Sequence, residues 1–346
     1  MTPSKQQSYT LYVGIDIAAA TASVALMTPN QTTTDEAFRI EQTEPGITGL
    51  VAKLVALGHP VDQIRVVMEA TGTYWMRLAT RLYRAGFAVS VVNSAQAYHY
   101  ARAWLQRAKT DELDAQMLAY LAYQMQPDLW VPNPAIYEEL EQRLVERESL
   151  LSIRQQLRNQ LHALCHRPIV IAAVEERKHA LLASIQEQID AIEREIKTLM
   201  RQEHAWSSSA QLLQDIQGIG MLTAAWLLVA THNFTDCSSP EQLVAYVGLA
   251  PYPRESGTSI RRRGQIGHAG HARLRHALYM ATLSATRHNP AIRTFYDRLR
   301  AKGKPMKVAR CAAARKLIHI AWAVVTKQIP YDPYYQSNRQ IQRQMA

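Results

Sequence analysis

The sequence has little cysteine and no long hydrophobic run. Its 346 residues include three cysteines, Cys165, Cys237 and Cys311, which lie far apart. Such spacing argues against a disulfide framework and a zinc knuckle, and it suits a reducing cytosol. The longest apolar runs, such as residues 221–230, are too short to cross a bilayer. Residues 1–8 lack the apolar region of a signal peptide, so we expect a cytoplasmic protein without a membrane partner.

Acidic residues are scarce in the last third of the chain. Residues 254–327 contain 17 lysines and arginines but only two acids, Glu255 and Asp297. This excess of positive charge is larger than the net charge of +10 of the whole chain, so the remainder is net negative. A basic segment joined to a mildly acidic remainder indicates a polyanionic partner, most simply nucleic acid. A solvated basic surface is the plainer alternative.

The hydrophobic residues (47%) and charged residues (20%) occur in the proportions of a folded protein, and the length allows two or three domains. The apolar pattern predicts an α/β class for the first third and an all-α class for the rest. We expect an α/β domain over residues 1–134, a helical coiled-coil arm over 135–205, and a helical domain over 206–346.

In the first third, runs with a period of two alternate with helical runs. The expected order is βββαβαβα, a three-strand meander followed by units that require parallel pairing in a mixed sheet. The strands are expected at 9–17, 22–28, 36–41, 64–68 and 87–92, and the helices at 46–57, 74–85 and 111–124. Asp16 and Glu69 end the first and fourth strands. Because open α/β sheets place their sites at the carboxyl ends of strands, these two acids mark a candidate site.

A second pair of acids begins the helix expected at 111–124. Asp111 and Asp114 are three residues apart, so they lie on one side of a helix. Taken alone, the pair fits a cap in which Thr110 or Asp111 begins the helix and Asp114 completes a capping box. With the two strand-end acids they make four hard oxygen donors, which suit one or two Mg²⁺ ions in phosphoryl transfer. Over residues 9–125 this arrangement resembles the RNase H-like (RuvC-type) nuclease fold.

Prolines at 127, 132 and 134 separate this domain from two long helices, expected at 136–166 and 172–204. In the second helix, apolar residues recur at alternating spacings of three and four, which is the a/d pattern of a coiled coil. They are Leu182, Ile185, Ile189, Ile192, Ile196 and Leu199. An antiparallel helical hairpin and a dimerising arm both satisfy this pattern. We expect the arm to act as a spacer and a subunit contact.

The last third has two features that suit contact with nucleic acid. Gly218 and Gly220 flank an apolar residue, as in a helix-hairpin-helix turn that presents backbone N–H groups to a phosphate. An ordinary tight turn between helices has the same pattern. Basic side chains then recur along a loop and several helices, where we expect them to contact a phosphate backbone. They are Arg254, Arg261, Arg262, Arg263, Arg273, Arg275, Lys302, Lys304 and Lys307.

The loop expected over residues 247–264 contains Ser256, which precedes a glycine and has arginines on both sides. Arginines could hold a phosphodiester there while a metal ion or a general base activates the hydroxyl. Thr258 and Ser259 are alternative hydroxyls. His271 belongs to a group of histidines without a cysteine or acid cluster, so we expect a DNA-facing or capping role rather than zinc binding.

In this order and spacing, the motifs are similar to those of the DEDD-type insertion-sequence transposases, the group of bridge-RNA-guided recombinases with a RuvC-like domain. The likeness runs almost end to end. Its carriers are Val13-Gly-Ile-Asp16, Glu69-Ala-Thr-Gly-Thr-Tyr74, Lys109-Thr-Asp111-x-x-Asp114-Ala, Gly218-Ile-Gly220, Gly248-Leu-x-Pro251, Glu255-Ser256-Gly257, Arg273-x-x-x-x-Leu278-Tyr279 and Arg298-Leu-x-Ala-x-Gly303-Lys304.

This resemblance implies a division of labour within a bacterial cytoplasmic enzyme. Asp16, Glu69, Asp111 and Asp114 would form the DEDD tetrad that holds Mg²⁺. Ser256 would attack DNA, leaving a phosphoserine link and a free 3′ hydroxyl. Family members act as dimers or tetramers, and a structured bridge RNA pairs with double-stranded donor and target DNA. Sequence choice would then reside mostly in base pairing, while the protein reads shape and backbone.

Two rival functions are also compatible with the sequence. A metal-binding tetrad alone predicts water as the nucleophile, which describes a structure-specific nuclease of the junction-resolving type. A non-catalytic nucleic-acid scaffold would use its acids only for caps and ion pairs. The basic last third and Ser256 favour the recombinase over the nuclease. The sequence leaves open whether the serine meets the tetrad within one chain or between two protomers.

Overall fold

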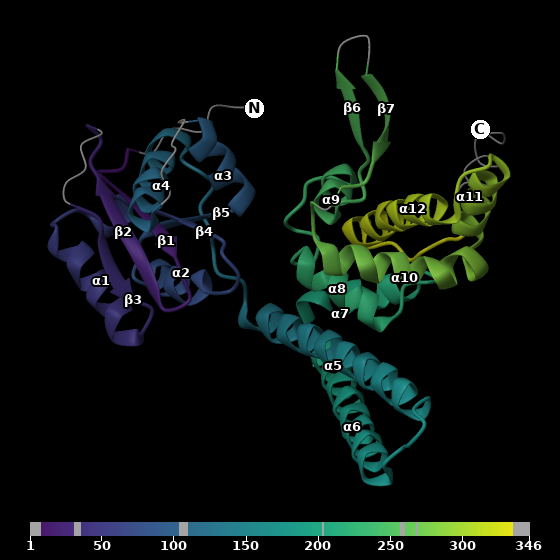
Figure 1. The fold of residues 1–346 in the computed structure, drawn as a ribbon. Helices are drawn as coiled ribbons and strands as arrows, with labels where there is room; N and C mark the ends of the chain where they lie inside the picture. The colour runs from purple at the N-terminus through teal and green to yellow at the C-terminus, as the bar shows by residue number, and fades with distance from the viewer. Residues whose placement is uncertain are drawn as a thin grey trace, which may run out of the picture. The chain divides into compact units, whose positions relative to one another are not determined.

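The structure is a computed structural model that describes residues 8–30, 36–103, 110–202, 204–256, 260–267 and 269–334. The chain divides into two compact units, Met1–Pro132 and Asn133–Ala346. The first unit is a mixed α/β sheet domain and the second is mainly helical (Figure 1). This confirms the expected α/β and helical classes. No helix among the described residues is long and apolar enough to span a membrane.

The first unit contains a five-stranded sheet in the order β3-β2-β1-β4-β5. The strands β1, β2 and β3 pair antiparallel, whereas β4 pairs parallel with β1 and β5 pairs parallel with β4. Their bounds are Leu11–Ile17, Thr21–Met27, Phe38–Glu41, Ile64–Glu69 and Ala88–Val92 for β1 to β5. The meander followed by parallel strands is the order that the sequence predicts.

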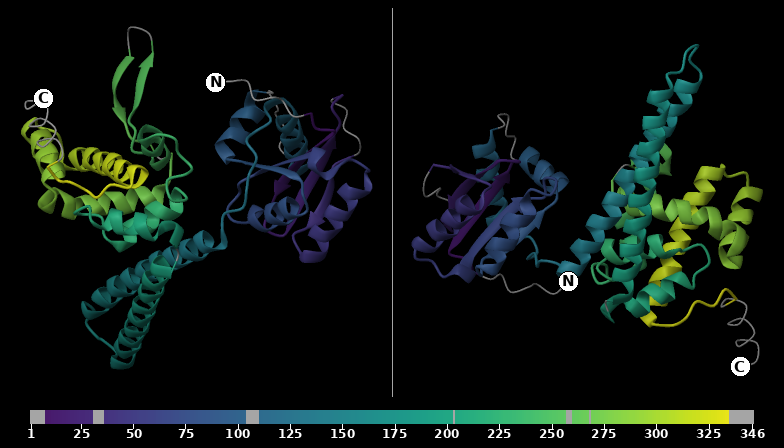
Figure 2. Two further views of the ribbon diagram at one scale, coloured as in Figure 1. Left: turned by 180° about the vertical axis from the view of Figure 1, so that it is seen from behind. Right: turned by 90° about the horizontal axis from the view of Figure 1, so that it is seen from below.

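Helices cover both faces of this sheet (Figures 1 and 2). The helices α1 (Glu44–Ala56) and α2 (Trp75–Arg84) bury Leu50 and Leu82 against one face, together with Val13 of β1. On the other face, α3 (Ser94–Ala103) and α4 (Asp111–Met125) pack over Tyr12 and Val67. Alternate residues of β1 therefore enter two different cores, as a period of two requires.

The helix α3 was not predicted from the sequence. It buries a single residue, Ala97, so it has no apolar stripe that would reveal it. A short 3-10 turn, Val61–Gln63, also precedes β4.

The second unit begins with the long helices α5 (Ala135–Cys165) and α6 (Ala172–Gln202). Cross-contacts join Arg143 to Glu195 and Arg147 to Glu193, so residue numbers rise on one helix as they fall on the other. The two helices are thus an antiparallel hairpin (Figure 1). Leu144 and Ile196, near the base of this hairpin, belong to the same core as the helices that follow.

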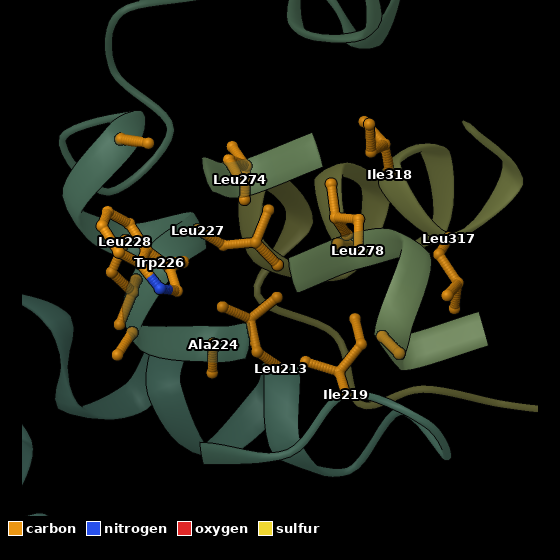
Figure 3. Close-up of a cluster of buried hydrophobic side chains, with 14 of the residues drawn as sticks. Leu213, Ile219, Ala224, Trp226, Leu227, Leu228, Leu274, Leu278, Leu317 and Ile318 are labelled. Atoms are coloured by element: carbon orange, nitrogen blue, oxygen red, sulfur yellow. The ribbon is translucent and has the colours of Figure 1, made fainter. Parts of the chain in front are cut away.

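The remaining helices enclose a large hydrophobic core (Figure 3). Leu213, Leu227, Leu278 and Leu317 come from four different helices, and each is fully buried. These helices are α7 (His204–Gln214), α8 (Met221–Ala230), α9 (Pro240–Val247), α10 (Ala272–His288), α11 (Pro290–Ala301) and α12 (Met306–Lys327). Burying side chains of this size contributes about 1.5–3 kcal/mol each before the entropy cost of folding is counted.

The prediction of a loop over residues 247–264 is wrong for most of these residues. Between α9 and α10 the chain forms a two-stranded antiparallel hairpin, β6 (Tyr252–Ser256) and β7 (Ile260–Gln265). β6 contains one arginine and β7 three, and neither strand carries an alternation of apolar residues, so the usual signal of a half-buried strand is missing. Cross-strand backbone hydrogen bonds, which leave no trace in the sequence, define this element.

Candidate functional site

Asp16 and Glu69 lie side by side at the carboxyl ends of two parallel strands. The register pairs Ile15 of β1 with Met68 of β4, and each acid follows its member of this pair. Ile15 and Met68 are buried in the core beneath α1 and α2. Because side chains alternate along a strand, both acids therefore belong to the opposite face, which α4 covers.

Helix α4 reaches that face because Gly14 has no side chain. A Cβ atom at Gly14 would lie 2.8 Å from the carbonyl carbon of Leu118 and closer still to the backbone of Ala119. Glycine therefore allows the helix backbone to rest directly on β1. This contact brings the first turn of α4, which carries Asp111 and Asp114, to the strand end that carries Asp16.

Thr110 caps this helix, and its hydroxyl accepts a hydrogen bond from the backbone N–H of Leu113 at 3.3 Å. One of the two capping alternatives is thus confirmed. Asp114 lies one position beyond the N3 site of a capping box. The cap is therefore complete without the carboxylates of Asp111 and Asp114.

The four acids are electrostatic neighbours. Burial and, in decreasing order, the charges of Asp114, Asp111 and Glu69 raise the pKa of Asp16 to about 6. A carboxyl that is partly buried beside three like charges resists ionisation. The other three sequence-predicted acids therefore lie near enough to Asp16 to act on its pKa.

Arg39 is a member of this site that the sequence did not reveal. Its guanidinium forms an ion pair with Asp111 at 3.1 Å, and both side chains are more than half exposed. The sheet register explains its position, because Arg39 of β3 pairs with Ser23 of β2, which pairs with Asp16 of β1. A single arginine on a short edge strand carries no sequence signal for this role.

The donor set of the site fits a divalent cation. Four carboxylates are hard oxygen ligands, and a cation would relieve the repulsion that raises the pKa of Asp16. In the described part of the chain, no three His, Cys, Asp or Glu side chains are already gathered closely enough to hold one ion. Binding would thus require small movements of side chains such as Asp111, which Arg39 now engages.

In the second unit, the two glycines of the predicted helix-hairpin-helix turn have different surroundings. Gly218 has a φ of 106°, and a Cβ there would lie 2.5 Å from Cβ of Ala285 on α10. It therefore serves close packing between helices. Gly220 is the N-cap of α8 without a side-chain cap, and a Cβ added there would meet nothing within 4 Å. Of the two residues, Gly220 leaves the open approach that a phosphate contact needs.

Ser256 is the last residue of β6 and pairs through its backbone with Ile260 of β7. Along the same hairpin, Arg254 pairs with Arg262 and Glu255 with Arg261. For residues 253–256 and 260–263, including Arg263, the structure describes the backbone alone. Thr258 and Ser259, the alternative hydroxyls, lie outside the described residues.

Arg275 anchors the base of this hairpin. Its guanidinium donates to the carbonyl oxygens of Val247 (3.2 Å) and Ala269 (2.7 Å), which lie before and after the two strands. Gly248 and Gly270 meet at the same place, where a Cβ on Gly270 would lie 2.6 Å from the nitrogen of Gly248. Both glycines have a positive φ, so larger residues would be strained there as well as crowded.

The other basic residues predicted to contact nucleic acid differ in their surroundings. Arg273 forms an ion pair with Glu148 of α5 at 3.1 Å. Lys302, Lys304 and Lys307 are exposed around the start of α12. Arg273 and Arg275 thus have partners within the protein, whereas these three lysines face solvent.

His271 caps helix α10, which is one of the two roles that the sequence predicts for it. Its Nδ1 accepts a hydrogen bond from the backbone N–H of Leu274 at 3.1 Å. Burial lowers the pKa of His271, and the nearby charges of Arg273 and Arg275 act in the same direction. A neutral imidazole is what an accepting Nδ1 requires.

Comparison with known proteins covers both units. Residues 13–167 match a family model of the IS110-type DEDD proteins described as "Transposase", and residues 210–297 match one described as "Transposase IS116/IS110/IS902 family". The chain is 30% identical to the pilin gene-inverting protein of Moraxella bovis over 93% of this chain and 97% of that protein. It is 23% identical to the transposase for insertion sequence element IS1111A of Coxiella burnetii, over 77% of this chain and 79% of the relative.

Proposed function

The chain belongs to the family of DEDD-type insertion-sequence transposases, and we propose that it cuts and rejoins DNA through a phosphoserine intermediate at Ser256. Asp16, Glu69, Asp111 and Asp114 would hold Mg²⁺. The observation that carries this proposal is the electrostatic contact of Asp16 with the other three acids at the end of β1. Such a cluster is costly without a cation, so a structural role alone accounts for it poorly.

We also assign the first unit to the RNase H-like, RuvC-type fold. The support is its order of strands, an antiparallel meander joined through β1 to two parallel strands. The positions of the acids agree with this assignment, since Asp16 is the next-to-last residue of β1, Glu69 ends β4, and the other two acids lie in the first turn of α4. A mixed sheet without a bound cation would gain nothing from carboxylates at these places, because they repel one another.

In the proposed reaction, the Ser256 hydroxyl attacks a DNA phosphodiester. A bond forms between Oγ and phosphorus while the bond from phosphorus to the 3′ oxygen breaks, and the serine proton ends on the released 3′ hydroxyl. Attack of another 3′ hydroxyl on the phosphoserine rejoins the strands and restores the serine. A bound Mg²⁺ would supply neutralising charge at the phosphate. The four acids of the tetrad would position the ion, and the arginines of β6 and β7 would hold the phosphate oxygens.

The tetrad and Ser256 belong to different units of the chain. We propose that they meet on the DNA, either within one chain or between protomers of a dimer or tetramer. The hairpin of α5 and α6 is the proposed coiled-coil arm for subunit contact. A structured bridge RNA would select donor and target DNA, and the basic second unit would bind the nucleic-acid backbones.

Trapping of a covalent protein–DNA adduct tests the serine. Full-length protein is incubated with DNA, Mg²⁺ and RNA from its element, and the products are separated on a denaturing gel. We expect an adduct with the wild type and none with Ser256→Ala. Thr258→Ala and Ser259→Ala are the matched controls and should retain it. An adduct that survives Ser256→Ala would remove the serine assignment. Cleavage that persists in Ser256→Ala without any adduct would favour the nuclease that uses water.

A further inference from the structure

A cavity of about 530 Å³ in the second unit lies away from the serine hairpin in the fold. It is bounded by α11, α12 and residues 329–334, which follow α12. Its size is within the range of small-molecule sites, about 300–1,000 Å³. Neither the tetrad nor the turn at Gly220 contributes to its walls.

Aromatic rings line this cavity on two sides. Phe295 of α11 is partly buried, and Tyr331 and Tyr334 lie on the segment after α12. The hydroxyl of Tyr331 donates to Oδ1 of the buried Asn289 at 2.8 Å, which fixes that ring. Tyr334 is 60% exposed at the rim. Rigid rings at a wet rim suit stacking of a planar ligand.

Positive charge lies beside one of these rings, that of Phe295. The Nζ atom of Lys316 is 5.0 Å, and Cζ of Arg298 is 5.4 Å, from the centre of the Phe295 ring. Lys327 is the third cation of the lining, against one acid, Asp332. Among the described residues, none of the three cations lies within ion-pair distance of a carboxylate.

The surroundings of Lys316 favour an anionic ligand. Its ammonium donates to the carbonyl oxygen of Ala291 at 3.2 Å. Burial, followed by the charge of Arg298, lowers the pKa of Lys316. An anion between these two cations would offset both effects, and a phosphate has the charge and the acceptor oxygens to do so.

We propose that this cavity binds one unpaired nucleotide, with the base among Phe295, Tyr331 and Tyr334 and the phosphate on Arg298, Lys316 and Lys327. The proposal rests on the proposed function in that a nucleic acid is the substrate, but it does not require Ser256 or the tetrad. Aromatic rings interleaved with cations are the common device for holding single strands, whereas a base paired inside a duplex cannot enter such a cavity.

Binding of short single strands tests this assignment. The probes are fluorescent oligothymidylate, oligouridylate of equal length, and a blunt DNA duplex, each titrated with full-length protein. Because stacking on an aromatic ring contributes about 1–3 kcal/mol per base, Phe295→Leu should weaken single-strand binding about 5- to 150-fold. Lys316→Met should weaken it as well and reduce its salt dependence by about one phosphate contact. Duplex binding should change little in both variants.

Two matched controls lie on the same helices but outside the cavity. Tyr296→Leu removes the aromatic neighbour of Phe295, and Arg315→Gln removes a charge next to Lys316. Both should keep single-strand affinity within about twofold of the wild type. Equal losses in the controls, or unchanged binding in Phe295→Leu and Lys316→Met, would overturn the proposal. Should a partly buried variant misfold, Arg298→Met and Lys327→Met probe the exposed rim by the same criteria.

Photo-crosslinking identifies the strand that enters the cavity. Halogenated uracil couples on irradiation to an aromatic ring on which it stacks, so strands containing it as DNA or as RNA are offered separately. We expect crosslinks within residues 290–298 or 329–334, and the efficient strand identifies the source of the nucleotide. Crosslinks confined to other segments would refute the site. A failed Ser256 adduct together with these crosslinks would remove the serine mechanism and leave the cavity assignment intact.

Discussion

The backbone carbonyl of Ala115 occupies the space that a side chain on Gly14 would need. This contact joins α4 to the middle of β1 without any intervening side chain. Asp111 lies one helical turn before Ala115, and Asp16 lies two residues after Gly14 on the same face of the sheet. The closeness of helix and strand is therefore what brings acids from distant parts of the sequence together.

Replacement of Gly14 by alanine should disrupt this arrangement. The added methyl group would collide with backbone atoms of α4, which cannot move aside as a flexible side chain can. We expect the free energy of unfolding to fall by about 1–3 kcal/mol or more, as in other overpacked cores, and strand cleavage to be lost. Urea denaturation measures the first effect. Gly49→Ala on α1 is the control, since a Cβ added at Gly49 would meet nothing within 4 Å. This substitution should raise the free energy of unfolding by about 0.5–1 kcal/mol.

The raised pKa of Asp16 predicts a specific pH dependence of stability. The pKa is about 6 in the folded protein, against 3.8 for an ordinary aspartate. The folded state thus binds the proton more tightly, and the contribution of Asp16 to stability is lost as pH rises from about 4 through 6. Asp16→Asn should flatten this part of the profile and stabilise the metal-free protein at pH 7, by less than the full free energy of the pKa shift because solvent screens a partly exposed carboxylate. An unchanged profile in the variant would contradict the assignment.

Magnesium should stabilise the folded protein through the same four acids. Ligands that bind only the folded state raise its melting temperature, so we expect Mg²⁺ at pH 7 to raise the Tm of the wild type. Asp16→Asn should lose this response together with strand cleavage, while DNA binding remains. Glu112→Gln is the matched control, because Glu112 is exposed on the same first turn of α4. Equal responses to Mg²⁺ in the wild type and Asp16→Asn would exclude Asp16 as a ligand.

Loss of the Arg275 guanidinium should loosen the base of the serine hairpin. Arg275→Met leaves the carbonyls of Val247 and Ala269 without their donor, which costs about 1–3 kcal/mol where such groups are buried. We expect faster limited proteolysis between residues 248 and 270, detected by mass spectrometry of the fragments. Arg287→Met removes an exposed arginine from the same helix. The protease should cleave this variant at the wild-type rate. Equal rates for the two variants would show that Arg275 does not anchor the hairpin.

Several parts of the fold could be derived from the sequence because local patterns encode them. Any fold that buries Val13 and Ile15 keeps the alternation of side chains along β1 and leaves Asp16 near the end of that strand. Thr110 and His271 were recognisable as cap candidates because a cap is formed within four residues of chain. By contrast, α3 has no apolar stripe, and the strands β6 and β7 have no alternation of apolar residues, so local patterns could not reveal them.

Contacts between distant residues were beyond such patterns. Arg39 reaches Asp111 only because β3 is the edge strand beside β2, and Arg275 reaches two carbonyls only because Gly248 and Gly270 meet. The spacing of Gly218 and Gly220 fits both a phosphate-binding turn and an ordinary tight turn, and only the packing shows that Gly218 lies against Ala285 of α10.

The sequence alone determined the order of the five strands in the first unit, the positions of the four acids along the chain, and the basic character of the last third. These properties follow from side-chain periodicity and charge, which are local. Only the tertiary structure decided that the acids share one electrostatic environment around Asp16 and that Ser256 ends a strand. Both depend on which segments pack together, and that choice follows from burial summed over the whole of each unit rather than from any single stretch of sequence.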